Sequence, residues 1–171
     1  MNSRERLNLA LNHQEPDRIP FDLGATVLTS IHHKSYNALR KHLGLPEVDP
    51  QIVDIFQQIV TVDDDMRDLL KVDVRDVAPR SSATFRIDIK EMEGYTYFYD
   101  EWGIGWKMPK EGGWYYDMFD HPLKDAQTIA DIENYPWPDP VDQARFAGMA
   151  ERGMAYERLD QLTVELLYGV R

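Results

Sequence analysis

Two aspartates, Asp22 and Asp76, stand where a carboxylate could take part in catalysis. Each lies at or near the end of a short stretch with strand-like character, residues 19–24 and 72–77. In α/β barrels the catalytic groups lie at the carboxyl ends of the strands, facing the pocket. Asp22 and Asp76 are therefore the candidate catalytic residues. The alternative is that both are ordinary loop acids, which are common on an acidic surface.

Arg75 and His32 are the candidate substrate-binding residues. Arg75 directly precedes Asp76, and His32 follows the loop after the first predicted strand. Imidazole changes charge near neutral pH, so His32 or its neighbour His33 could carry a proton or ligate a metal. Adjacent residues on a helix point about 100° apart, so the two rings cannot readily share one ion. A pair with one exposed and one packed histidine is the alternative interpretation.

Three consecutive acids, Asp63, Asp64 and Asp65, suggest a calcium loop at first sight. An EF-hand loop needs a glycine at its sixth position and a bidentate acid at its twelfth. Counted from Asp63, those positions hold Asp68 and Val74, so the pattern fails. Acids in the first turn of a helix also favourably oppose its dipole. This stretch is therefore expected to open a helix.

Several other site classes are excluded by motif. The Gly103-Ile104-Gly105 sequence lacks the third glycine and the following helix of a dinucleotide site, and neither a P-loop nor a serine-hydrolase elbow is present. With no cysteine, thiol nucleophiles, disulfides and zinc–thiolate sites cannot form within these residues.

The elements that must position the candidates follow from hydrophobic spacing and turn residues. Apolar periodicity predicts helices, the first capped by Ser3 and the third with a break near residues 61–62. These helices cover residues 3–12, 30–43, 50–71, 125–134 and 139–159. Residues 19–24, 72–77 and 162–169 are expected to form strands. This order suggests α/β units that carry an antiparallel insertion.

Residues 83–120 differ in texture and predict a β-meander of three or four strands. More than half of the chain's aromatic residues lie there, between glycines that suit turns. The aromatic residues could stack on a flat ligand or sugar. Cross-strand aromatic pairing explains their density equally well without a ligand.

Composition limits the partners. The formal net charge is −11 with 43% hydrophobic residues, so we expect a folded protein that binds neither nucleic acid nor an anionic membrane. The N-terminal residues lack the apolar stretch of a signal peptide, and no run of about 18 apolar residues occurs. A cytoplasmic protein is the expectation.

Several segments together resemble the uroporphyrinogen decarboxylase superfamily, which also contains the methylcobamide:coenzyme M methyltransferases. They are residues 3–6, 11–21, 69–75, 100–103 and 135–140. The resemblance implies an α/β fold, a (β/α)8 TIM barrel. A closed barrel takes about 250 residues, so residues 1–171 would supply its N-terminal half, with the β-meander at about 83–120 as an insertion.

The resemblance also divides the functional question. Uroporphyrinogen decarboxylases carry an Arg-Gln-Ala-Gly-Arg element that binds substrate carboxylates, and here it falls on Ala25 to Thr29 with both arginines lost. The family's catalytic aspartate falls on Asp76, where it would stabilise cationic pyrrole nitrogens or another polarised ligand. The methyltransferase branch is therefore favoured, and porphyrinogen decarboxylation is the alternative.

In the methyltransferases, zinc held by a His-x-Cys and a later Cys activates a thiol that accepts methyl from a corrinoid. Those ligands belong to the C-terminal half of the family, so zinc and corrinoid are expected in a complete enzyme and neither in this chain alone. The expected partners are a tetrapyrrole or corrinoid-linked small molecule and either a second copy or a complementary C-terminal half. A non-catalytic interaction module, with an open sheet edge for pairing, is a further alternative.

Overall fold

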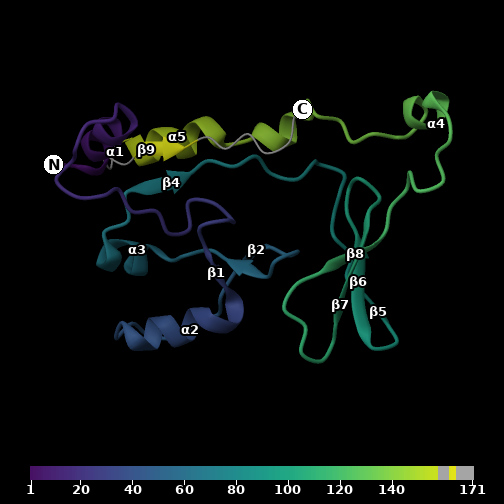
Figure 1. Cartoon of the computed structure of the whole chain (residues 1–171), viewed down its shortest axis with the longest axis horizontal. Helices are drawn as coiled ribbons and strands as arrows, with labels where there is room; N and C mark the ends of the chain where they lie inside the picture. Colours follow the sequence, from purple (N-terminus) through teal and green to yellow (C-terminus); the bar gives the residue numbers. More distant parts are fainter. Residues whose placement is uncertain (158–161, 165–171) are drawn as a thin grey trace. The chain divides into compact units, whose positions relative to one another are not determined.

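The computed structural model describes residues 1–157 and 162–164 (Figure 1). The chain folds as two compact units. The first unit contains residues 1–54 and 58–79 and the described residues from 146 onward, and the second unit contains residues 55–57 and 80–145.

The first unit combines four helices with two small sheets. Its three-stranded sheet is antiparallel with the order β1-β3-β2, and β4 pairs in parallel with β9. The bounds are α1 (Ser3–Leu11), β1 (Ile31–His32), α2 (His33–His42), β2 (Ile52–Asp54), β3 (Ile59–Val60), α3 (Asp64–Leu70), β4 (Val74–Asp76), α5 (Met149–Glu157) and β9 (Leu162–Val164).

The core of the first unit lies between α2, β3 and α3. Its fully buried side chains are Tyr36, Val60, Val62 and Met66, with partly buried leucines packed around them. Arg40 is also buried there, and its guanidinium binds both carboxylate oxygens of Asp65 at 2.9 and 2.6 Å. This ion pair fixes α2 against the start of α3.

The expected helix over residues 50–71 forms only in its second half, as α3. Residues 52–60 form the β2–β3 hairpin instead, and Gln58 makes its turn with a φ of 57°. This stretch is rich in β-branched isoleucine and valine, which favour strands. The apolar positions in this stretch fit both the helical and the strand period. The strand preference of the β-branched residues decides between the two.

The start of α1 differs in detail from the expectation. Asn2, and not Ser3, is the N-cap: its side chain accepts from the Glu5 amide, and the Glu5 side chain binds the Asn2 amide in return. The Ser3 hydroxyl is thereby left to donate to Asp73 Oδ1 at 2.7 Å.

Asp73 is the hub that ties α1 and the following loop to β4. It is fully buried, and its carboxylate accepts from Ser3, from Arg6 Nη1 at 2.6 Å and from Arg18 Nη1 at 2.6 Å. The Phe21 amide donates to the same carboxylate at 2.9 Å, and the Phe21 carbonyl accepts from the Asp73 amide at 2.8 Å.

The strand expected over residues 19–24 is absent from the described structure. Pro20 has no N–H to donate to a ladder, and the Phe21 amide is taken by the Asp73 side chain. The segment therefore runs beside β4 without strand geometry.

The second unit is built on an antiparallel sheet with the order β5-β6-β7-β8. This sheet lies within the stretch where the sequence predicts a β-meander. The elements are β5 (Lys90–Met92), β6 (Tyr95–Tyr99), β7 (Gly105–Pro109), β8 (Asp117–Asp120), α4 (Ile129–Glu133) and a 3₁₀ helix, η1 (Gln143–Phe146), which reaches the first unit with its last residue.

Aromatic rings form the core of the second unit. Phe98 is fully buried, and its ring centroid lies 5.3 Å from that of Phe56 and 4.9 Å from that of Tyr116. The Phe56 ring also meets Trp106 edge-on at 4.9 Å. Edge-to-face packing of this kind accounts for the high aromatic content of the sheet.

The remaining predictions near the C-terminus hold in part. The helix over 125–134 is shortened to α4, which Thr128 caps. The helix over 139–159 is divided into η1 and α5, with Gly148 between them at a φ of 74°. Residues 162–164 form β9, and the rest of the predicted strand, residues 165–169, lies outside the described residues.

The half-barrel expectation is wrong. A (β/α) barrel needs successive parallel strands joined by helices, whereas the described strands form two antiparallel sheets and one two-stranded parallel pair. Two local causes account for this outcome: residues 19–24 do not form the first strand, and residues 52–60 form a hairpin where a helix was needed. The fold is a small α/β arrangement without β/α repeats in its described part.

Candidate functional site

β4 positions two of the predicted site residues, Arg75 and Asp76, at its carboxyl end. Arg75 is buried and Asp76 is half-buried. The alternation of charged and apolar residues over 72–77 would suit a strand with one solvent-exposed face. In the structure, Arg75 in β4 and Asp73 just before it are buried along with the valines. β4 therefore carries charge into the interior, which a protein tolerates only where it is compensated or used.

Asp22 lies in the loop that precedes α2. Its Oδ1 accepts from the Ala25 amide at 3.0 Å, which closes a tight turn. Gly24 occupies this turn with a φ of 80°, and a Cβ there would lie 2.6 Å from a methyl of Val62. Only glycine fits, because a side chain would meet both backbone strain and the core.

The charge of Asp22 acts on the carboxyl of Asp76, although burial has the larger effect. Burial raises the pKa of Asp76 above its usual range, and the negative charge of Asp22 adds to this rise. The positive charges of Arg67 and Arg152 oppose it. A carboxyl group in this setting holds a proton more readily than a solvated one, as general acids and bases do.

Arg75 and Arg67 both approach Asp64 Oδ1, at 3.9 Å from Arg75 Nη2 and 3.8 Å from Arg67 Nη1. Burial lowers the pKa of Arg75, and the positive charge of Arg67 lowers it further. Among the described residues, the carboxylates of Asp64 and Asp68 each lie 3.9 Å from Nη2 of Arg75. The side chains of both acids are mostly exposed, so the compensation that they offer is weak.

His32 occupies a different point of the fold, as the N-cap of α2. Its Nδ1 accepts from the Lys34 amide at 3.1 Å, and its ring centroid lies 4.7 Å from that of His33. Burial lowers the pKa of His33, and the neighbouring His32 and Lys34 add to the effect. The structure gives His32 a helix-capping position, and a substrate-binding role for it stays a prediction.

Two arginines whose charges act on Asp76, Arg67 and Arg152, were not predicted from the sequence. Arg67 stands in α3 among apolar residues, and arginine in a helix is normally exposed. The sequence holds no signal for the burial of Arg67, because adjacent residues on a helix point about 100° apart and the burial of Met66 does not extend to its neighbour. Arg152, in α5, is fixed by donation from its Nη2 to the Ala78 carbonyl at 2.8 Å, a contact that no local pattern indicates.

The acidic triplet at the start of α3 has a structural task. Asp63 is the N-cap, and Asp64 and Asp65 lie in the first turn. Asp65 binds Arg40, and Asp63 accepts from the Tyr36 hydroxyl at 2.7 Å. Among the described residues, no group of three or more histidine and acidic side chains could hold a metal ion. The zinc ion that the resemblance implies has its ligands in the C-terminal half of the family and not in these residues.

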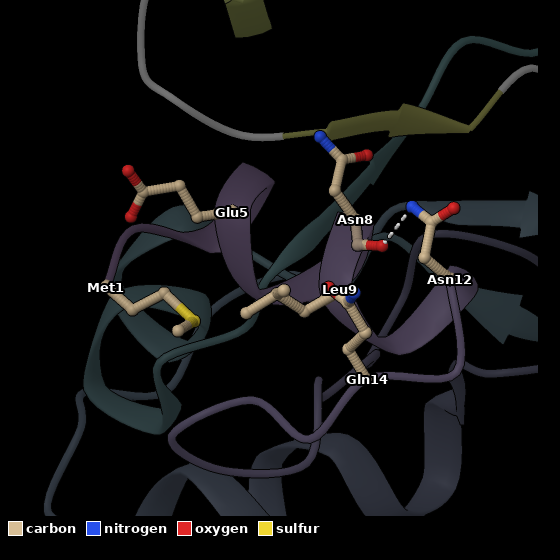
Figure 2. A pocket seen from close by; sticks show the side chains of 6 residues that line it. All are labelled: Met1, Glu5, Asn8, Leu9, Asn12 and Gln14. Atoms are coloured by element: carbon tan, nitrogen blue, oxygen red, sulfur yellow. Dashed lines mark hydrogen bonds between the residues drawn. The ribbon is translucent and has the colours of Figure 1, made fainter.

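A pocket of about 400 Å³ opens on one side of α1 (Figure 2). Its lining includes Glu5, Asn8 and Asn12, and the Asn12 amide donates to the Asn8 carbonyl at 2.7 Å. The one carboxylate in the lining, Glu5, is engaged by the Asn2 amide. The lining thus offers no group poised for chemistry, and β4 remains the better candidate site.

Comparison with protein-family models, with curated proteins and with solved structures finds no match to this chain. None of the helices in residues 1–157 is both long and apolar enough to cross a membrane.

Proposed function

We propose that this chain binds a small molecule at the carboxyl end of β4 and that Asp76 is its catalytic residue. The observation that carries the proposal is the setting of the Asp76 carboxyl, which is half-buried and feels the charges of Arg67, Arg152 and Asp22. Charged groups gathered in an interior without close pairing destabilise a fold, and such clusters are typical of functional sites.

The reaction class comes from the resemblance to the uroporphyrinogen decarboxylase superfamily. Methyl transfer from a corrinoid is the preferred activity, with the thiolate-activating zinc supplied by other residues than those described here. Asp76 would hold or release a proton at a polarised atom of the ligand, because burial, with a smaller contribution from the charge of Asp22, keeps the pKa of Asp76 high. Porphyrinogen decarboxylation is the second candidate, with Asp76 facing a cationic pyrrole nitrogen.

The test replaces Asp76 by Asn in the full chain and assays both reactions. Methyl transfer from methylcobalamin to a thiol and decarboxylation of uroporphyrinogen are each measured with and without added zinc. We expect one activity to be present and to fall by about 100-fold or more in Asp76→Asn, the range for loss of a general acid or base. Asp88→Asn, a change of an exposed acid in the second unit, is the matched control.

Activity in the parent chain that Asp76→Asn leaves intact would remove Asp76 from the site. Absence of both activities would refute the proposed reaction class for this chain.

A further inference from the structure

Two buried arginines of the first unit, Arg67 and Arg75, have no close ionic partner among the described residues. Arg67 is 7% exposed and Arg75 is 3% exposed. Charged side chains are rarely so buried unless they are paired and hydrogen-bonded. A buried guanidinium group without such a partner is therefore a candidate for binding a ligand.

The described contacts of both groups are sparse. Arg67 Nη2 donates to the Gly24 carbonyl at 3.0 Å, and Arg75 Nη1 donates to the adjacent Val74 carbonyl at 3.2 Å. Asp64 Oδ1 lies 3.8 Å from Arg67 Nη1 and 3.9 Å from Arg75 Nη2, too far for a hydrogen bond. Arg67 Nε is buried with no hydrogen-bond partner within the described part of the chain.

The other buried arginines of the first unit are saturated. Arg40 binds Asp65 through two nitrogens at 2.9 and 2.6 Å, and its Nε donates to the Pro46 carbonyl at 2.6 Å. Arg6 Nε donates to Asp17 at 2.7 Å, and its Nη1 donates to Asp73 at 2.6 Å. In the first unit, the arginines that stabilise the fold form close hydrogen bonds with carboxylates. Arg67 and Arg75 form no such bonds with the described carboxylates.

We propose that Arg67 and Arg75 form a subsite for an oxyanion, the carboxylate or phosphate group of the ligand that reacts at Asp76. The inference rests on the proposed function and specifies that the ligand carries a negatively charged oxyanion group. A guanidinium presents parallel N–H donors that match two oxygens of one anion. An anion bound there would reduce the repulsion between the two cations and give the buried Nε–H of Arg67 an acceptor.

The test measures binding of inorganic phosphate and of acetate to the full chain by thermal unfolding, against sodium chloride at equal ionic strength. The phosphate and acetate arms distinguish the two sources of the oxyanion. We expect saturable stabilisation by at least one of the two anions. Arg67→Gln should weaken its binding about tenfold or more, since a hydrogen bond to a charged group contributes about 1.5–3 kcal/mol.

Arg80→Gln, a change of an exposed arginine in the second unit, is the matched control and should bind as the parent does. Because Arg67→Gln could fail to fold, NMR of the arginine Nε–Hε groups provides a measurement on the unmodified chain. Addition of the anion should shift the Arg67 signal, assigned from Arg67→Lys.

Three outcomes would overturn the subsite: no stabilisation beyond that of chloride, no shift of the Arg67 signal, or equal weakening by Arg80→Gln. Asp76→Asn separates this proposal from the previous one, because it should abolish activity and leave anion binding in place. Activity that depends on Asp76 without any anion binding would refute the subsite alone. Anion binding without activity would refute the proposed reaction alone.

Discussion

Asp73 shows how a single buried charge can organise a fold. Burial by itself would raise the pKa of Asp73, but the bonds from Phe21, Ser3, Arg18 and Arg6 outweigh it and hold that pKa below its usual range. We expect Asp73→Asn to lower the free energy of unfolding by about 3–5 kcal/mol, because it leaves buried arginine charge uncompensated. Urea unfolding at neutral pH measures the loss.

Asp88→Asn removes only an exposed pair with Lys90 and serves as the control, with an expected change below about 1 kcal/mol. Equal losses in the two variants would show that the Asp73 network does not stabilise the fold.

The same network predicts the acid limit of stability. The pKa of Asp73 is lowered, and Arg6 holds the pKa of Asp17 at about 2. Unfolded aspartate titrates near pH 4, so the unfolded chain takes up protons first as the pH falls. The stability due to these carboxylates is therefore complete above about pH 4 and is lost toward pH 2. Unfolding by urea across this range should show a steep fall that Asp73→Asn flattens.

Asp76 is expected to have the opposite effect on the pH dependence of stability. Its pKa is raised in the folded state, so above about pH 4 the unfolded chain releases a proton that the folded chain retains, and stability falls as the pH rises. Asp76→Asn should increase the free energy of unfolding at neutral pH by about 1 kcal/mol, within the range of single substitutions. The gain should vanish at about pH 4. A loss of stability at neutral pH would contradict the desolvated state of this carboxyl.

At the scale of elements, the β2–β3 turn contributes residues 55–57 to the second unit, and Phe56 is the one with an aromatic ring. Its ring meets Phe98 and Trp106, and truncation of a half-buried ring should weaken the sheet. We expect Phe56→Ala to lower stability by about 2–4 kcal/mol, somewhat below the value for a fully buried phenylalanine. Tryptophan fluorescence during urea unfolding, to which Trp106 contributes, measures the change. Val53→Ala, at an exposed position of β2, should leave the transition nearly unchanged.

Elements with a strong local signal are predictable from the sequence. The helix over residues 30–43 appears as α2 with Leu43 as its C-cap and Gly44 just beyond it at a φ of 74°. The strand over 72–77 appears as β4. The failures occur where tertiary contacts compete with local pattern: the amide of Phe21 binds a side chain 52 residues away, and no property of residues 19–24 indicates this.

The candidate site was predictable to a similar extent. Strand-end reasoning selects Asp22, Arg75 and Asp76, and their role in a site stays a prediction. This reasoning cannot select Arg67, because the burial of a charged helix residue depends on what packs over it. His32 was selected by its place after a predicted strand that does not form, so the argument for it has lost its basis.

At the scale of the whole molecule, the net charge of −11 opposes the compact state by self-repulsion. The buried pairs, such as Arg6 with Asp73, are shielded little by salt, whereas repulsion among exposed acids is shielded strongly. Added salt should therefore relieve more repulsion than the attraction that it removes. This balance of long-range charge against short-range pairs decides how the protein responds to ionic strength.

We expect the midpoint of thermal unfolding to rise by about 2–4 °C between low salt and about 0.5 M sodium chloride at neutral pH, which corresponds to about 1 kcal/mol for a chain of this length. Differential scanning calorimetry measures the shift. Near the isoelectric point the net charge is small, so the same addition of salt should have little effect there. A midpoint that falls with salt at neutral pH would mean that exposed ion pairs such as Lys124 with Asp120 contribute more than the repulsion, against the usual weakness of surface pairs.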